Sequence, residues 1–310
     1  MRGRAIAELA AAAALGALQT VAFVDGDLWP LQMIAIALLA WRVGASTPAR
    51  AALLGFLFGV GWLCAGTWWM YVSMHRYGGL SAGLAALAVL ALAAFLSLYL
   101  AAAMALVARW RPRAPMRAAL LFGAAWLLAE LARGVLLTGF PWVASGYAYV
   151  DAPLAGFASW LGVYGVGAVG ATLAARFGFA DLRRARGWVA PGGVLVVALV
   201  AGALLGRVDF TTPTRALTVS LLQGNVPQEE KFDGGHLDSG LAATAAQVEA
   251  ARGELVVGPE TVIPVLFTEL DEKWWQGLLE RFRAPGRAAI LGIPMGDAEH
   301  GYTNSAIGIS

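Results

Sequence analysis

The chain has 310 residues, of which 59% are hydrophobic and only 14% are charged. Soluble globular domains carry about 25% charged residues, so most of this chain is not expected to lie in water. Residues 1–206 contain fourteen Arg, no Lys and six acidic residues, whereas residues 207–310 contain eight basic and fourteen acidic residues. This division predicts a basic membrane region over 1–206 and a mildly acidic soluble region over 207–310, with no basic and aromatic pattern typical of nucleic-acid binding.

Seven apolar runs come close to the roughly 20 residues that a bilayer requires. They lie at about 5–24, 28–44, 51–74, 80–108, 117–138, 153–176 and 188–206. The first is interpreted as a transmembrane helix and not as a signal peptide, because no convincing cleavage site precedes Asp25 and further apolar runs follow. The second run is short and the fourth is long, so we expect tilt or an interfacial extension there.

The arginines predict the orientation of these seven spans. With the N-terminus inside, twelve arginines fall on the inner side and three on the outer side. The inner ones are Arg2, Arg4, Arg42, Arg50, Arg109, Arg111, Arg113, Arg117, Arg176, Arg183, Arg184 and Arg186, and the outer ones are Arg76, Arg133 and Arg207. Positive residues favour the cytoplasmic side, so the region after residue 206 is predicted to be periplasmic in a bacterial inner membrane.

Two features inside the spans are predicted to be structural. The glycines at 55, 59, 162, 165, 167 and 170 have the spacing of close helix packing. Glu130 and Arg133 are three residues apart on one helix and can pair, which we favour over contact with a lipid headgroup.

The soluble region alternates between strand and helix patterns. We expect strands at 216–222, 254–257, 288–293 and 303–309, and helices at 236–252 and 268–283. This order predicts an α/β domain, and its core is small for a sheet of this type, so the domain is expected to be incomplete. The three histidines, His75, His236 and His300, are too scattered for a metal site, the lone Cys64 excludes an internal disulfide, and no cofactor is predicted.

The strongest candidate for chemistry is Glu260, in the run Gly258-Pro259-Glu260-Thr261-Val262-Ile263-Pro264. The run follows a short apolar strand, and open α/β sheets keep their active sites at the carboxyl ends of strands. Two prolines stiffen the turn, so its carboxylate is suited to act as a positioned general base. The alternative is an ordinary acidic residue in a turn.

Five groups of residues, in order along the chain, resemble the apolipoprotein N-acyltransferases. They are Gly55-Phe56-Leu57-Phe58-Gly59 through Trp69-Met70-Tyr71-Val72-Ser73-Met74-His75 and Gly78-Gly79; Gly139-Phe140-Pro141-Trp142 with Gly146-Tyr147; Gln223-Gly224-Asn225-Val226-Pro227-Gln228 with Lys231-Phe232; the run around Glu260; and Tyr302-Asn304-Ser305. The resemblance implies a membrane bundle carrying a periplasmic nitrilase-like domain with αββα layers. It also implies acyl transfer from a phospholipid to the α-amino group of a lipoprotein's diacylglyceryl-cysteine, through a thioester on the Cys of a Glu-Lys-Cys triad.

Within this resemblance, Glu260 matches the general base. Neither Lys231 nor Lys273 matches the triad lysine, and Cys64 lies in the membrane region. The family's Lys and Cys follow the Tyr-Asn-Ser strand, so this chain by itself is expected to be inactive. The family's final transmembrane helix is not matched either.

Six further residues are candidates for substrate contact: Asn225, Gln228, Phe232, Trp142, Tyr302 and Asn304. Turn hydrogen bonding explains Asn225 and Gln228 about as well, and an interfacial anchor is the commoner use of a tryptophan such as Trp142. The alternative function is a non-catalytic membrane scaffold or lipid-binding protein. A transporter is disfavoured because Glu130 and Arg133 can neutralise each other, and the seven spans exclude a soluble amidase.

Overall fold

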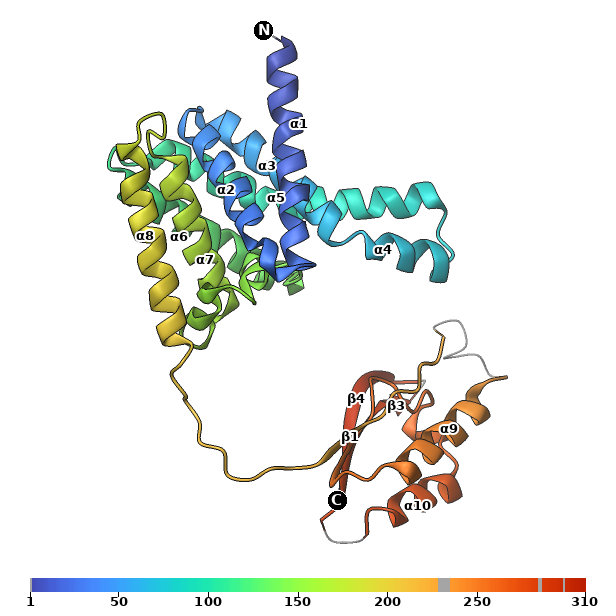
Figure 1. The fold of residues 1–310 in the computed structure, drawn as a ribbon. Coiled ribbons are helices and arrows are strands. Elements are labelled where there is room, and N and C mark those ends of the chain that lie inside the picture. Colours follow the sequence, from blue (N-terminus) through green and yellow to red (C-terminus); the bar gives the residue numbers. More distant parts are fainter. Residues whose placement is uncertain (1, 228–234, 284–285, 298) are drawn as a thin grey trace. The chain divides into compact units, whose positions relative to one another are not determined.

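The computed structural model describes residues 2–227, 235–283, 286–297 and 299–310. The chain forms two compact units, Met1–Phe210 and Thr211–Ser310, and each is described here by itself. The first unit is helical and the second is an α/β unit (Figure 1).

Over residues 2–210, the helical unit contains eight α-helices joined by turns and short helical segments. They are α1 (Arg2–Leu18), α2 (Trp29–Gly44), α3 (Pro48–Gly66), α4 (Trp69–Val72), α5 (Ala82–Trp110), α6 (Pro115–Val135), α7 (Ala158–Gly178) and α8 (Arg186–Leu205). Single-turn helices are η1 (Gln19–Phe23), η2 (Gly26–Leu28), η3 (Ser73–Tyr77), η4 (Leu136–Thr138), η5 (Ser145–Tyr149) and η6 (Pro153–Phe157).

Local sequence signals explain where several of these helices begin and end. Thr47 accepts a hydrogen bond from the backbone N–H of Arg50, and Pro48 occupies the first position of α3, an arrangement that starts helices. Pro115 likewise occupies the first position of α6, where Ala114 provides no side-chain cap. α5 ends at Trp110, since Arg111 precedes Pro112 and has ψ 119°, away from the helical conformation that residues before proline avoid.

Six helical segments in the described part of the chain are long and apolar enough to cross a membrane. The predicted span 28–44 does not meet that length: α2 has 16 residues, or about 24 Å of helix. The predicted span 51–74 is also wrong in extent, because α3 ends at Gly66 and the chain turns before α4. The predicted span 153–176 is a helix with a kink, where Gly162 has φ +66°.

Arginines from several helices meet at one end of this unit. Glu8 of α1 forms ion pairs with Arg42, at the end of α2, and with Arg50, at the start of α3. Arg111, just after α5, donates from Nη2 to the carbonyl of Gly44 over 2.8 Å, and its guanidinium lies 5.4 Å from the ring centroid of Phe179. The start of α1 and the end of α2 therefore lie at the same end, so α2 runs antiparallel to α1 despite its short length.

Glycines allow the closest helix contacts, as the spacing predicts. A Cβ on Gly59 would lie 2.7 Å from Ser97 Oγ of α5, and one on Gly55 would lie 2.6 Å from Met104 Cγ. α3 and α5 therefore pack with their backbones close together.

Among its described residues, the α/β unit is built on a sheet with strand order β1-β2-β3-β4. Its strands are β1 (Val219–Leu221), β2 (Leu255–Val257), β3 (Ala288–Asp297) and β4 (Gly301–Ile309). β1, β2 and β3 are parallel, and β4 is antiparallel to β3. The predicted alternation of strands and helices is confirmed, but β1 is shorter than the predicted 216–222 and β3 is longer than the predicted 288–293.

Two helices, α9 (Leu237–Ala250) and α10 (Glu272–Glu280), lie on one side of this sheet (Figure 1). Val248 of α9 and Leu278 of α10 share one core with Val256, Leu291 and Ile293 of the strands. The helix predicted over 268–283 is present but shorter, because the Asp271 side chain accepts from the N–H of Trp274 over 2.8 Å and starts α10 there. The opposite face of the sheet exposes Leu221 and Ile290.

Candidate functional site

Glu260 lies in a tight turn directly after β2. The turn is fixed to β3 by two backbone bonds, from the N–H of Gly258 to the carbonyl of Ile290 over 2.8 Å and from the N–H of Ile263 to the carbonyl of Gly292 over 3.1 Å. A Cβ on Gly292 would lie 2.5 Å from the backbone nitrogen of Thr261, so only glycine admits this approach. Thr261 has φ +51°, a conformation that is rare for a β-branched residue and that marks strained backbone.

A cavity of about 240 Å³ opens beside this turn. Its lining residues come from the segment after β1, the start of α9 and the turn after β2: Gly224, Asn225, Val226, His236, Gly240, Thr244, Pro259, Glu260, Thr261, Val262 and Pro264. The cavity therefore lies at the carboxyl ends of two parallel strands, which is where open α/β sheets bind ligands.

Asn304 of β4 connects this turn to the far edge of the sheet. Its side-chain amide donates to a carboxylate oxygen of Glu260, and its carbonyl oxygen accepts from Thr261 Oγ1 over 3.5 Å. Asn304 is placed there by the register of the hairpin, in which it lies opposite Pro294. An amide that donates to a carboxylate holds its orientation, as a positioned general base requires.

The other predicted residues are distributed unevenly around this cavity. Asn225 lines it and has φ +49°, so its backbone is in the left-handed region that asparagine tolerates. Tyr302 is 69% exposed on β4 and is not among the residues that line the cavity. Gln228 and Phe232 lie outside the described residues.

Three residues of the cavity were not assigned to a site from the sequence: His236, Gly240 and Thr244. His236, considered from the sequence only as a metal ligand, directly precedes the first residue of α9. The signal that points to it is topological, because a helix that follows a parallel strand begins at the carboxyl edge of the sheet.

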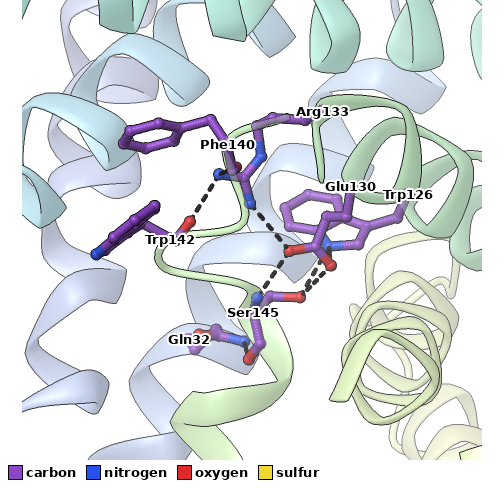
Figure 2. Close-up of polar contacts among 7 residues, drawn as sticks. All are labelled: Gln32, Trp126, Glu130, Arg133, Phe140, Trp142 and Ser145. Carbon is purple, nitrogen blue, oxygen red and sulfur yellow. Dashed lines mark hydrogen bonds and ion pairs between the residues drawn. The ribbon is translucent and has the colours of Figure 1, made fainter. Parts of the chain in front are cut away.

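Trp142 belongs to the helical unit, where it lies in the segment after α6. Figure 2 shows the residues that make polar contacts with this segment. Those that belong to α-helices are all buried: Gln32, Trp126, Glu130 and Arg133. Glu130 and Arg133 form the predicted ion pair, with Arg133 Nη2 3.7 Å from Glu130 Oε1. Glu130 makes shorter bonds elsewhere, since it accepts from the N–H and Oγ of Ser145 over 2.7 and 2.8 Å and from Trp126 Nε1 over 3.1 Å.

Arg133 also contacts this segment (Figure 2). Its Nη1 donates to the carbonyl oxygens of Phe140 and Trp142 over 3.2 and 2.7 Å. On the other side, Gln32 Nε2 of α2 donates to the carbonyl of Ser145 over 2.9 Å. The sequence predicted the ion pair but not these partners, which are distant in sequence or belong to the backbone.

The chain combines helices of membrane-spanning length with an α/β unit that has a carboxylate at its strand ends. This combination defines a multi-pass membrane protein that carries an enzyme-like domain. The family model described as apolipoprotein N-acyltransferase N-terminal domain matches residues 15–176. The chain belongs to the apolipoprotein N-acyltransferase family.

Curated relatives extend the similarity into the α/β unit. The apolipoprotein N-acyltransferase of Verminephrobacter eiseniae is 47% identical over 302 residues, which cover 91% of this chain and 56% of the relative. That of Ralstonia nicotianae is 42% identical, with 96% of this chain and 58% of the relative covered. That of Pseudomonas syringae pv. tomato is 38% identical, with 94% and 60% covered. The chain thus spans less than two thirds of the length of these relatives.

Proposed function

We propose that this chain forms the membrane region and part of the catalytic domain of an acyltransferase. It transfers an acyl chain from a phospholipid to the α-amino group of the diacylglyceryl-cysteine of an apolipoprotein. The observation that carries the proposal is the Glu260 carboxylate, which lies at a cavity on the carboxyl edge of the sheet and is oriented by the Asn304 amide. The family of the chain supplies the class of reaction.

The proposed reaction has two steps. A cysteine thiolate attacks the ester carbonyl of the phospholipid, a C–S bond forms, and the ester C–O bond breaks to release a lysophospholipid, whose alkoxide takes up a proton. The lipoprotein amine then attacks the thioester, a C–N bond forms, the C–S bond breaks, and the amine loses a proton. Glu260 first accepts the proton of the thiol, and it gives that proton to the lysophospholipid as the ester bond breaks. In the second step Glu260 accepts the proton that the amine loses.

The cysteine and lysine of this mechanism are matched by no residue of this chain, since its lysines are Lys231 and Lys273 and its cysteine is Cys64. Asn225 is proposed to contact substrate at the cavity that it lines. Asn304, Gln228, Phe232 and Tyr302 are proposed as further substrate contacts. Trp142 is proposed to contact the lipid from the helical unit.

We also propose the setting of the protein. The arginine-rich end of the helical unit lies on the cytoplasmic side of the inner membrane, and the α/β unit is periplasmic. The α/β unit is of the nitrilase-like αββα type, in which a second sheet covers the face that exposes Leu221 and Ile290. Leu221 and Ile290 lie on the same face of the sheet because both are in register with Val257.

Glu260→Gln in the protein expressed from its own gene tests this proposal. The amide has the same size but accepts a proton poorly, so we expect the rate of acyl transfer to a lipopeptide in membranes to fall about 100- to 10,000-fold. Glu280→Gln, an exposed glutamate of α10 that pairs with Arg283, is the matched control and should leave the rate within about twofold. Equal transfer rates in both variants would show that Glu260 is not the general base, and no transfer by the parent protein would favour a non-catalytic scaffold or lipid-binding protein.

A further inference from the structure

The segment that joins α6 to η5 has an unusual backbone. Leu137, Thr138 and Gly139 have φ of 54°, 72° and 81°, and Val143 has φ 51°. A Cβ on Gly139 would lie 2.0 Å from the carbonyl oxygen of Gly134, so glycine is required there. Left-handed conformations of leucine, threonine and valine cost free energy and persist only where surrounding contacts fix them.

Side chains from the helices supply those contacts (Figure 2). Arg133 binds the carbonyls of Phe140 and Trp142, and Glu130 binds both the backbone N–H and the hydroxyl of Ser145. Glu130 and Arg133 are 3% and 4% exposed. Two charged groups so deeply buried are expensive, and a pair whose only role was packing could be replaced by apolar residues at little cost to stability.

The held segment presents aromatic rings at the surface. The ring of Trp142 lies 5.3 Å from that of Phe140 and 6.5 Å from that of Trp69, measured between centroids. Trp142 is 52% exposed and Trp69 is 43% exposed. Val143 packs against α3, since a Cβ on Gly66 would lie 2.7 Å from its Cγ1. Arg133 thus fixes the backbone carbonyl of Trp142, while the Trp142 indole stays accessible.

We propose that Glu130 and Arg133 are positioning residues. Together they hold residues 137–145 in the strained conformation that places the Trp142 indole beside Phe140 and Trp69, where an acyl chain of the lipid can contact it. That the ligand is a lipid rests on the proposed function. The hold of Glu130 and Arg133 on residues 137–145, called the clamp below, rests on the contacts described above. Both residues act through the loop and are not catalytic.

The test uses the protein expressed from its own gene, in nanodiscs of phosphatidylethanolamine and phosphatidylglycerol with brominated acyl chains, which quench nearby tryptophans. The part of the quenching due to Trp142 is the difference between each protein and the same protein carrying Trp142→Phe. The informative variant is Glu130→Leu/Arg133→Leu, which removes both charges and so avoids leaving one unpaired. Arg133→Met is the second variant, and Glu8→Gln, which alters the ion pairs at the other end of the bundle, is the control.

In the double variant we expect amide exchange of residues 136–147 to rise at least about tenfold, and the Trp142-dependent quenching to fall by about half or more. Exchange in α3 and α5 should stay within about twofold, which shows that the bundle is still folded. Where acyl transfer is measured, the KM for phospholipid should rise while kcat changes little.

Unchanged exchange of the loop in both variants would overturn the clamp. A loosened loop with unchanged Trp142-dependent quenching would also overturn it, because the pair would then be structural only. Activity that survives Glu260→Gln would refute the proposed function and leave these two measurements intact.

Discussion

Glu260 and Asn304 are 44 residues apart in the chain, and the sequence marks each of them separately. What brings them together is the antiparallel register of β3 and β4, which sets Asn304 opposite Pro294 and over the turn after β2. The hydrogen bond between them converts a flexible acidic side chain into a directed one. The arrangement suits a base that must meet its proton in a fixed direction.

Asn304→Ala is therefore expected to reduce kcat/KM for acyl transfer about 10- to 100-fold, because a hydrogen bond to a charged group contributes about 1.5–3 kcal/mol. The neighbouring Thr303→Ala, which loses an exposed hydroxyl bonded to Ser305 and to the carbonyl of Met295, should change kcat/KM by less than about twofold. A steady-state assay with lipopeptide and phospholipid measures both. Similar values for the two variants would show that the Asn304 amide does not orient Glu260.

At the scale of elements, the contact of α3 with α5 depends on small residues. A Cβ on Gly59 of α3 would meet Ser97 Oγ of α5 at 2.7 Å and Ser97 Cβ at 2.9 Å. A Cβ on Gly83, near the start of α5, would meet nothing within 4 Å. We expect Gly59→Val to destabilise the helical unit by about 1–3 kcal/mol, because the helices must separate or strain.

Gly83→Ala is the control for this substitution and should leave stability unchanged or slightly raised, since alanine favours helix. Thermal unfolding in detergent, followed by circular dichroism, compares the two variants. Equal midpoints for Gly59→Val and the parent protein would mean that the two helices are not held together at this contact.

The same scale shows why some predicted element boundaries were wrong. Asp271 lies inside an amphipathic pattern that continues from 268 to 283, and only its capping bond to Trp274 reveals that the helix starts there. β3 extends beyond its apolar run because β4 pairs with it as far as Asp297 and Gly301. Periodicity detects an apolar face but does not detect which residues a neighbouring strand will pair.

At the scale of the molecule, the short helix α2 decides the topology. Its end contacts the start of α1, through Arg42 and Glu8, so the turn at 45–47 lies at the same end of the bundle as the N-terminal part of α1. We therefore expect α2 to cross the membrane in spite of its 16 residues.

Fusions of a phosphatase that is active only in the periplasm test this expectation. Activity should be at least about tenfold higher for a fusion after Gly26 than for one after Ser46, and high again after Gly79 and after Phe210. Equal activities after Gly26 and Ser46 would show that α2 stays on one side, and the orientation of every later helix would then reverse.

The sequence by itself determined the division into a membrane region and an α/β region, the order of strands and helices, the family, and the position of Glu260 after a strand. These follow from composition, apolar periodicity and short runs of residues, all of which are local. Only the tertiary structure decided that Asn304 binds Glu260, that His236 and Thr244 line the same cavity, and that Ser145, Phe140 and Trp142 are bound by Glu130 and Arg133. Those contacts join groups from different elements, and strand register and helix packing set their distances, which no local pattern encodes.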